Sequence, residues 1–314
     1  MQPPRKHGGA PNPGVALSRD NVNAATLVEA ITSWYRRHAR ELPWRAPQID
    51  GWAVLVSEVM LQQTPVARVL PAWEAWLQRW PTPKDMATAS PGDAVLAWGR
   101  LGYPRRALRL REAAVAITEQ HNGVVPDDIE QLRALPGVGE YTAAAVASFA
   151  HRQRHIVLDT NVRRVLERIE SGRELPPNSL TKAERKRAAI LLPDDPEAAA
   201  TWNVAAMELG ALVCTATNPR CGLCPVRERC AWLAAGKPAG EVPRRVQTYA
   251  GTDRQVRGRL LAALRDAAPE PVPTAALDAC WNEPLQRARA LDSLVADGLV
   301  DPLPDGSFTL PQNP

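Results

Sequence analysis

The sequence lacks long apolar stretches. It has no run of eighteen apolar residues, and its first residues lack the apolar segment of a secretory signal. Neither a membrane-spanning helix nor export is therefore expected, and we predict a soluble, intracellular protein of the cytoplasm. Cysteine is also scarce, since five cysteines in 314 residues do not make a disulfide framework.

The sequence has little excess of charge of one sign, because 38 lysines and arginines nearly balance 34 aspartates and glutamates and leave a formal net charge of +4. The positive charge is nevertheless clustered, with five arginines inside twelve residues: Arg100, Arg105, Arg106, Arg109 and Arg111. Such a cluster is either a solvated helix face or a patch that faces phosphates. The second interpretation needs neighbouring motifs that also face nucleic acid.

Composition divides the chain into four parts. Residues 1–22 are rich in proline and glycine without apolar periodicity, so they are predicted to be a disordered tail. Residues 23–235 are predicted to form a series of helices, and residues 236–252 a basic linker. Residues 253–314 are predicted to form three short helices and a hairpin, the order of a winged helix-turn-helix. The expected fold class is all-α, with a small winged-helix-like C-terminal part.

The segment LPGVGEY, residues 135–141, predicts a tight turn between two helices. Gly137 and Gly139 are expected to reach backbone angles closed to other residues and to leave the nearby amides uncovered. Free amides at a helix N-terminus bind anions such as phosphate. A plain helix connection is equally compatible with the motif taken alone.

Three acidic residues stand in unusual places. Glu58 lies inside the apolar helix predicted for residues 51–63. It either turns to solvent or pairs, or it occupies a low-dielectric site that raises its pKa and keeps a proton available. Glu208, in a later apolar helix, faces the same choice. Asp159 precedes another helix, so it is expected at the N-cap, where the helix dipole favours its ionised form.

Four cysteines crowd into seventeen residues in a C-x6-C-x2-C-x5-C pattern: Cys214, Cys221, Cys224 and Cys230. Structural zinc sites usually use two C-x2-C pairs, whereas this segment contains one close pair. The uneven spacing favours a 4Fe-4S iron–sulfur cluster.

These pieces suit chemistry on a nucleic acid. Two carboxylates in opposite environments divide acid and base work at a glycosidic bond, with Glu58 as the proton donor and Asp159 as the anion that stabilises an oxocarbenium-like sugar. The glycine turn and the arginines point to DNA, whose target base has to leave the stack. Tyr103, between the arginines, suits insertion between bases, although ordinary packing is equally compatible.

Several motifs in order resemble a known family. LPGVG, VLDTNVRRVL and the four-cysteine pattern resemble the helix-hairpin-helix glycosylases with an iron–sulfur cluster, the endonuclease III superfamily. SEVMLQQT, LPWR and RLGY are similar to the adenine DNA glycosylases of the MutY type. The resemblance covers roughly residues 25–235, making residues 23–235 the catalytic region with its cluster loop at 214–230. It implies a six-helix barrel module and an iron–sulfur module flanking a DNA cleft.

The resemblance also implies what the protein acts on. Such enzymes excise adenine opposite 8-oxoguanine or guanine in double-stranded DNA, with the Glu58 counterpart protonating adenine at N7. Four residues match the catalytic group: Glu58, Asp159, Tyr141 and Asn161. Four match the adenine pocket: Trp44, Arg45, Leu61 and Glu208. Five match DNA contacts, among them the probe of the opposite base and the wedge: Gln63, Thr64, Tyr103, Gly137 and Gly139.

Tyr141 stands where strand-cleaving relatives carry a lysine, whose amine attacks the sugar and forms a Schiff base. A tyrosine does not do this, so we expect a monofunctional enzyme. We also expect the protein to act as a monomer. Two other functions stay open: an endonuclease III-like pyrimidine glycosylase and AP lyase, and a non-enzymatic iron–sulfur DNA-binding regulator. The regulator gives Glu58 no reason to lie inside an apolar helix.

The C-terminal part departs from the pattern. Many members end in a Nudix-like domain that helps to read 8-oxoguanine, and residues 253–314 are too few and too helical to form one. We expect the winged-helix-like part to add DNA contacts instead.

Overall fold

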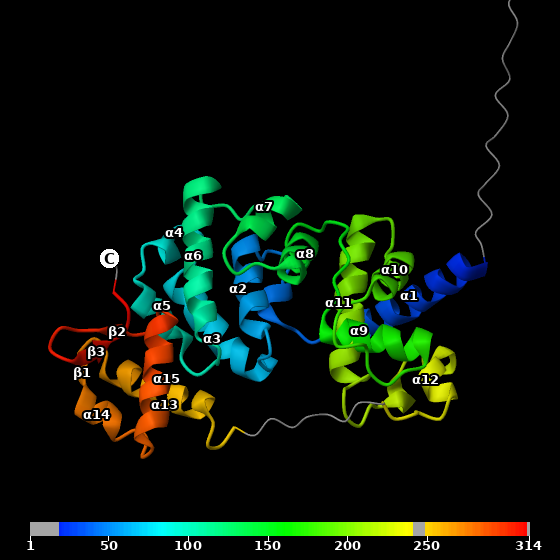
Figure 1. Ribbon diagram of the computed structural model, residues 1–314. Coiled ribbons are helices and arrows are strands. Elements are labelled where there is room, and N and C mark those ends of the chain that lie inside the picture. Colours follow the sequence, from blue (N-terminus) through cyan, green and yellow to red (C-terminus); the bar gives the residue numbers. More distant parts are fainter. Residues whose placement is uncertain (1–18, 241–248, 313–314) are drawn as a thin grey trace, which may run out of the picture.

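The computed structural model describes residues 19–240 and 249–312 (Figure 1). Most of the predicted tail and the middle of the predicted linker lie outside the described residues. The α-helices are α1 (Arg19–His38), α2 (Gly51–Leu61), α3 (Val66–Arg79), α4 (Pro83–Ala87), α5 (Pro91–Trp98), α6 (Arg105–Gln120), α7 (Ile129–Ala134), α8 (Glu140–Phe149), α9 (Thr160–Leu166), α10 (Lys182–Leu191), α11 (Pro196–Leu212), α12 (Ala231–Ala234), α13 (Asp253–Ala267), α14 (Thr274–Asp278) and α15 (Pro284–Ala296). Short helical segments are η1 (Pro43–Arg45), η2 (Glu167–Ser171), η3 (Cys221–Leu223) and η4 (Arg227–Arg229), and the strands are β1 (Val272–Pro273), β2 (Asp301–Pro302) and β3 (Ser307–Thr309). Helix α1 thus begins inside the stretch predicted to be a disordered tail.

The first half of the fold, α2 to α8, is built around tryptophans. The indole Nε1 of Trp73 in α3 donates to the carbonyl of Ala53 in α2 at 2.9 Å. Trp52 in α2 donates to the carbonyl of Trp80, at the end of α3, at 3.1 Å. Buried indole N–H groups need such partners. These two bonds fix α2 against α3 and so hold the helix that carries Glu58.

The second half joins distant parts of the chain. Helix α1 packs against α11 and α10, and α11 packs against α9, around a separate apolar core that runs from Leu27 to Val226. In Figure 1 the blue α1 lies beside green helices that come more than a hundred residues later. The chain therefore crosses between the halves twice, once before α2 and once before α9.

The C-terminal part has the three helices and the hairpin expected of a winged helix. Its small antiparallel sheet has the order β1-β3-β2, with Val272 and Pro302 both paired to Phe308. Gly306 turns the hairpin at φ +84°, in the left-handed region that favours glycine. Strand β1 is too short to leave an alternating pattern in the sequence.

This part docks on α5 and α6. The amide of Gly92, in the first turn of α5, donates to the carbonyl of Pro311 at 2.7 Å. A Cβ at position 92 would lie 2.6 Å from that oxygen, so the close approach requires glycine. Val95 of α5 belongs to the C-terminal apolar core, and its carbonyl accepts a hydrogen bond from Arg265 Nε at 2.9 Å.

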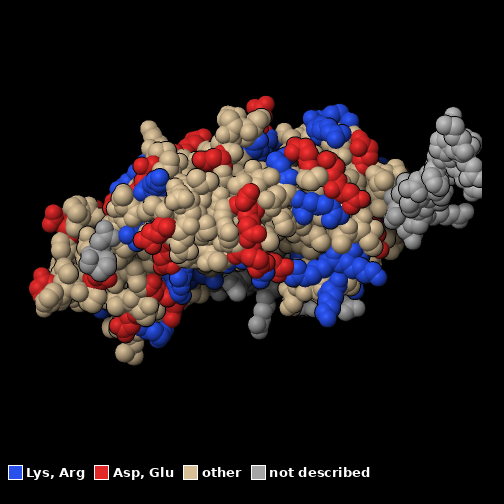
Figure 2. All heavy atoms as spheres, turned by 90° about the horizontal axis from the view of Figure 1, so that it is seen from above, with Lys and Arg blue, Asp and Glu red and all other residues tan. Residues whose placement is uncertain are grey.

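None of the described helices is both long and apolar enough to span a membrane. Figure 2 shows one face, on which acidic and basic side chains lie next to one another instead of in separate fields. Exposed ion pairs such as Arg185 with Glu140 and Arg133 with Glu130 have the same mixed character. Pairs of this kind contribute little to stability individually.

Candidate active site

Glu58 lies in a helix that is buried on every side. Residues 52–60 of α2 are all buried, so a carboxylate at position 58 does not reach solvent by rotating. The residue is 6% exposed, and its Oε2 accepts a hydrogen bond from the Tyr141 hydroxyl at 3.0 Å. Burial raises the pKa of Glu58 to about 7, against the lowering effect of the Tyr141 hydrogen bond. The geometry matches the low-dielectric site with an available proton.

Asp159 is the N-cap of α9, where its two oxygens accept N–H groups. Oδ1 accepts from the amide of Val162 at 2.6 Å and Oδ2 from the side chain of Asn161 at 2.7 Å. Burial nevertheless raises the pKa of Asp159, outweighing these hydrogen bonds and the charge of Arg164, which lower it. The predicted N-cap position is therefore confirmed, and burial acts on this carboxylate against the helix start. Two N–H donors still favour the carboxylate over the acid.

Tyr141, at the start of α8, connects the two carboxylates electrostatically. Burial raises the pKa of its hydroxyl well above the ordinary value, and the charges of Glu58 and Asp159 raise it further. The hydroxyl therefore stays protonated and donates to Glu58. Since the charge of Asp159 raises the pKa of Glu58 as well, the three groups form one electrostatic unit.

Glu208 differs from Glu58, although both lie in apolar helices. Its carboxylate is fully buried in α11 and accepts hydrogen bonds from Arg40 Nε and Nη2, both at 2.8 Å, and from Arg45 Nη2 at 2.9 Å. Burial alone would raise the pKa of Glu208, but the hydrogen bonds from these arginines outweigh it and lower the pKa to about 2. Glu208 is thus an ionised anchor for two guanidinium groups.

Of the other residues expected in the adenine pocket, Arg45 contacts this anchor directly. Arg45 Nη1 is buried and has no hydrogen-bond partner among the described residues, and the charge of Arg45 lowers the pKa of Glu58. Trp44 is buried edge-on against Trp73, with 5.6 Å between the ring centroids. Leu61 is half-buried at the end of α2. One buried guanidinium donor therefore remains for a ligand close to Glu58.

Gln63 and Tyr103 form an exposed pair at the end of α2. The Tyr103 hydroxyl donates to Gln63 Oε1 at 2.8 Å, and Tyr103 is 47% exposed. Both residues have positive φ, 55° and 47°, a conformation that residues other than glycine adopt rarely. Thr64 is buried beneath them, and its hydroxyl accepts from Arg106 Nη2 at 3.1 Å.

Four of the five clustered arginines make contacts within the protein. Arg106 Nη1 donates to the carbonyls of Val59 and Gln62, both at 2.7 Å. It thereby satisfies carbonyls at the C-terminus of α2, the negative end of the helix dipole. Three further arginines make contacts within the protein: Arg105 with Asp297, Arg109 with Glu112, and Arg111 with the carbonyl of Ala89.

The two glycines of the hairpin between α7 and α8 differ in what they require. Gly137 has φ +76°, and a Cβ there would lie 2.7 Å from Arg109 Cβ. Gly139 is the N-cap of α8 with φ −90°, and a Cβ there would meet no atom within 4 Å. The expectation that both need special backbone angles is therefore wrong for Gly139. The open space at Gly139 leaves the start of α8 accessible.

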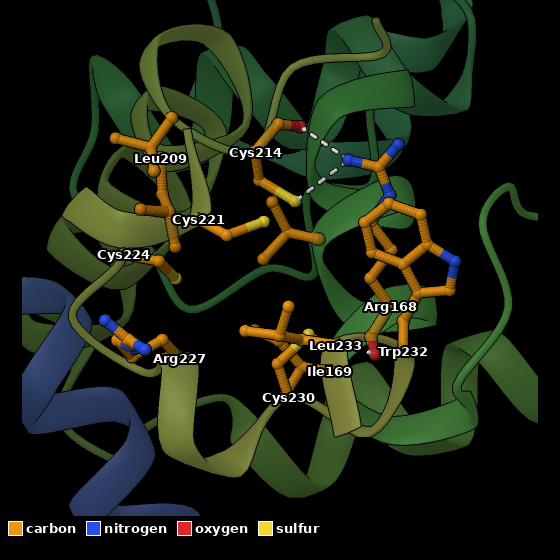
Figure 3. Close-up of a pocket in the computed structure, with 12 residues that line it drawn as sticks. Arg168, Ile169, Leu209, Cys214, Cys221, Cys224, Arg227, Cys230, Trp232 and Leu233 are labelled. Atoms are coloured by element: carbon orange, nitrogen blue, oxygen red, sulfur yellow. Dashed lines mark hydrogen bonds between the residues drawn. The ribbon is translucent and has the colours of Figure 1, made fainter. Parts of the chain in front are cut away.

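The four cysteines surround one pocket in the loop between α11 and α12 (Figure 3). Within residues 19–240 and 249–312, no group of three or more His, Cys, Asp or Glu side chains is arranged to hold a single metal ion. Four thiols around an apolar pocket fit a cluster with several iron atoms. Arg168, fully buried, lies 3.4 Å from Cys214 Sγ through Nη1 and stacks on Trp232 at 4.4 Å. Its charge offsets the negative charge of thiolate ligands.

Three further residues that support this site were not predicted from the sequence. Arg164 is buried and donates to Asn161 Oδ1 at 2.7 Å and to the carbonyl of Cys214 at 2.8 Å. Gly210 of α11 lies so close that a Cβ would be 2.7 Å from Asn161 Cβ. Arg40 anchors Glu208. The only signal was the one-turn spacing of Arg164 and Arg168 after Asp159.

Known proteins share these features. Residues 56–189 match the family described as HhH-GPD superfamily base excision DNA repair proteins, and residues 214–230 match the iron–sulfur binding domain of endonuclease III. The adenine DNA glycosylase of Mycolicibacterium smegmatis is 54% identical over 281 residues, which are 89% of this chain and 94% of that protein. The adenine DNA glycosylase of Mycobacterium tuberculosis is 56% identical over 283 residues, 90% of this chain and 92% of that protein.

The fold matches as well. The solved structure of a thermostable thymine-DNA glycosylase superposes with a TM-score of 0.63 at 25% identity, covering 69% of this chain and all of that one. The helix-hairpin-helix fold and the iron–sulfur cluster predicted from the sequence are thereby confirmed. The chain belongs to the adenine DNA glycosylases of the HhH-GPD superfamily.

Proposed function

We propose that the protein removes adenine that faces 8-oxoguanine or guanine in double-stranded DNA. It hydrolyses the N-glycosidic bond of a flipped-out nucleotide and leaves the strand intact. The observation that carries this proposal is the unit of Glu58, Tyr141 and Asp159, in which a buried acid faces a carboxylate held by N–H donors. The names of the two mycobacterial relatives support adenine as the excised base.

Glu58 is the general acid of the proposed reaction. With a pKa of about 7 it holds a proton at neutral pH and is buried away from competing water. It delivers this proton to the base, which then leaves as a neutral molecule. The buried Nη1 of Arg45 donates to the same base, and Glu208 keeps Arg45 in place.

Asp159 stabilises the sugar after the base has left. The anionic carboxylate, held by Val162 and Asn161, faces the positive charge that develops on an oxocarbenium-like sugar. Tyr141 supplies no amine for a Schiff base, so no elimination follows and the strand stays closed. All of these groups come from one chain, so the proposed reaction needs no residue from a second copy.

The mispair preference is tested with three duplexes. They carry adenine opposite 8-oxoguanine, adenine opposite guanine, and thymine glycol opposite adenine, and hot alkali then reveals abasic sites. We expect cleavage only in the adenine strands of the first two, and none with Glu58→Gln. Glu119→Gln, an exposed glutamate near the end of α6, is the matched control and should excise normally. Excision by Glu58→Gln at the wild-type rate would contradict the assigned acid.

Strand cleavage is tested with sodium borohydride. We expect no trapped protein–DNA adduct from the first two duplexes under single-turnover conditions. An adduct that disappears in Asp159→Asn would show Schiff-base chemistry and would favour the glycosylase and lyase reading.

A further inference from the structure

The C-terminal part of the chain touches the exposed pair at the end of α2. The guanidinium of Arg254, in the first turn of α13, lies 5.7 Å from the ring centroid of Tyr103. Arg106 lies 5.6 Å from the same centroid. Tyr103 and Arg254 are both exposed. A side chain 151 positions later in the chain thus joins Tyr103 and Gln63 on one surface.

The contact is backed by a packed interface. Arg265 of α13 donates to the carbonyl of Val95, and Pro311 accepts from Gly92. Asp297, after α15, pairs with Arg105 at 3.2 Å. These contacts lie on α5 and α6, the two helices on either side of the turn that carries Tyr103. The C-terminal part is therefore fixed to the base of this turn.

Two neighbouring glutamines relate Arg254 to the reaction site. The side chain of Gln62 lies 3.5 Å from Thr142 Oγ1 in α8, the helix of Tyr141. The side chain of Gln63 instead accepts from Tyr103. The two consecutive glutamines therefore engage different neighbours at the end of α2. Arg254 contacts Tyr103, the neighbour of Gln63, whereas the helix of Tyr141 is the neighbour of Gln62.

Helix α15, the third helix of the winged-helix arrangement, uses two of its arginines for contacts inside the C-terminal part. Its arginines are engaged by carboxylates within the same part, Arg287 with Asp278 at 2.7 Å and Arg289 with Asp253 at 2.9 Å. Leu285, at its start, is 80% exposed. Phosphate binding draws on arginine and lysine, and the arginine of the C-terminal part that lies against Tyr103 is Arg254 of α13.

We propose that the C-terminal part completes the DNA-binding surface on the strand that carries the base opposite adenine. Arg254, stacked on Tyr103, contacts a backbone phosphate of that strand when Tyr103 enters the duplex. A planar guanidinium stacks on a ring and still donates N–H groups to phosphate. The proposal rests on the proposed function, because it takes the Glu58 side as the site of the flipped adenine.

The first test measures binding of the full-length protein to a duplex with a tetrahydrofuran abasic analogue opposite 8-oxoguanine. We expect Arg254→Ala to raise the Kd about tenfold and to reduce the salt dependence of log K by about one unit. Arg259→Ala is the matched control, because Arg259 is an exposed arginine of the same helix that stacks on Trp281 at 5.0 Å. It should leave both values unchanged. Equal effects of the two substitutions would overturn the proposal.

The second test replaces single phosphates of the duplex with neutral methylphosphonates. When one particular phosphate beside 8-oxoguanine is neutralised, the affinity of the wild type should fall about tenfold. The affinity of Arg254→Ala should not change with the same substitution in the DNA. A coupled position on the other strand, or none, would contradict the proposal. If wild type binds as expected but excises no adenine, the proposed function fails and the binding result stands separately.

Discussion

Arg164 donates to the side-chain carbonyl of Asn161 at 2.7 Å through Nη2, and to the backbone carbonyl of Cys214 at 2.8 Å through Nε. Asn161 in turn donates to Asp159 at 2.7 Å. One buried guanidinium therefore joins the carboxylate of the reaction site to the first cysteine of the cluster loop. Loss of the cluster loop and loss of the carboxylate's position are expected to go together.

Arg164→Met should both destabilise the protein and slow excision. Removing a buried charged donor costs about 3 kcal/mol of the free energy of unfolding, and Asn161 loses the partner that orients it. We expect the single-turnover excision rate to fall at least about tenfold, or roughly 1.4 kcal/mol. Arg163→Met is the control, since Arg163 pairs with Glu184 away from Asn161. It should lose stability at an unchanged rate, and an equal fall in rate would speak against a role specific to Arg164.

The excision rate should depend on pH through Glu58. The acid must be protonated to act and has a pKa of about 7, so the single-turnover rate should fall as pH rises through 7. Tyr141→Phe removes the hydrogen bond that lowers the pKa of Glu58, so the fall should move to higher pH. A fall that stayed at the same pH in Tyr141→Phe would mean that another group is titrating.

The same raised pKa affects stability. The folded protein binds this proton more tightly than the unfolded chain, whose glutamate has a pKa of 4.5. The stabilising contribution of Glu58 is therefore complete below pH 4.5 and is lost as pH rises through about 7, in total about 3 kcal/mol. Urea unfolding at several pH values should show this loss in wild type and not in Glu58→Gln.

Gly210→Ala should disturb the reaction site without touching a ligand. The new Cβ would lie 2.7 Å from Asn161 Cβ and 2.9 Å from its carbonyl oxygen, so α9 has to shift. Overpacking of this kind costs about 1–3 kcal/mol. Excision should slow because a shift of Asn161 also moves Asp159, to which Asn161 is hydrogen-bonded. The control is Gly258→Ala in α13, where a Cβ meets only the end of the Tyr249 side chain at 3.2 Å. Normal excision by Gly210→Ala would show that α9 tolerates the shift.

The two hairpin glycines should separate folding from DNA binding. Gly137→Ala combines a positive φ with a close contact to Arg109, so we expect a loss of about 1–3 kcal/mol in stability. Gly139→Ala meets no atom and should leave the midpoint of urea unfolding unchanged. It should nevertheless weaken binding to duplex DNA, because a methyl group then covers the start of α8. Unchanged affinity in Gly139→Ala would argue against a phosphate at this helix start.

Local pattern predicted the parts of the site that depend on one segment. The burial of Glu58 follows from an apolar helix, and the position of Asp159 follows from the change from an extended segment to a helix. The cluster follows from cysteine spacing. None of these features requires knowledge of which segments meet.

Contacts between distant segments could not be predicted from local sequence patterns. Glu58 and Glu208 stand in similar apolar helices, and only the arrival of Arg40 and Arg45 from another element makes one of them ionised. The sequence was ambiguous in the same way for the arginines after residue 100, because a guanidinium donates to a carbonyl or to a phosphate and the sequence does not show which one it meets. Arg106 binds carbonyls of α2, and Arg254 reaches Tyr103 from the far end of the chain.

The two crossings between the halves have a consequence for synthesis on the ribosome. The core of α2 to α8 is complete once residue 150 has emerged, whereas α1, made first, has to wait for α9 to α11 and Val226 before its apolar face is covered. Glu58 belongs to the early half and Asp159 to the late one. A nascent chain that stops before α9 therefore holds the acid, the wedge and the hairpin, but lacks the carboxylate of Asp159 that completes the centre for base removal.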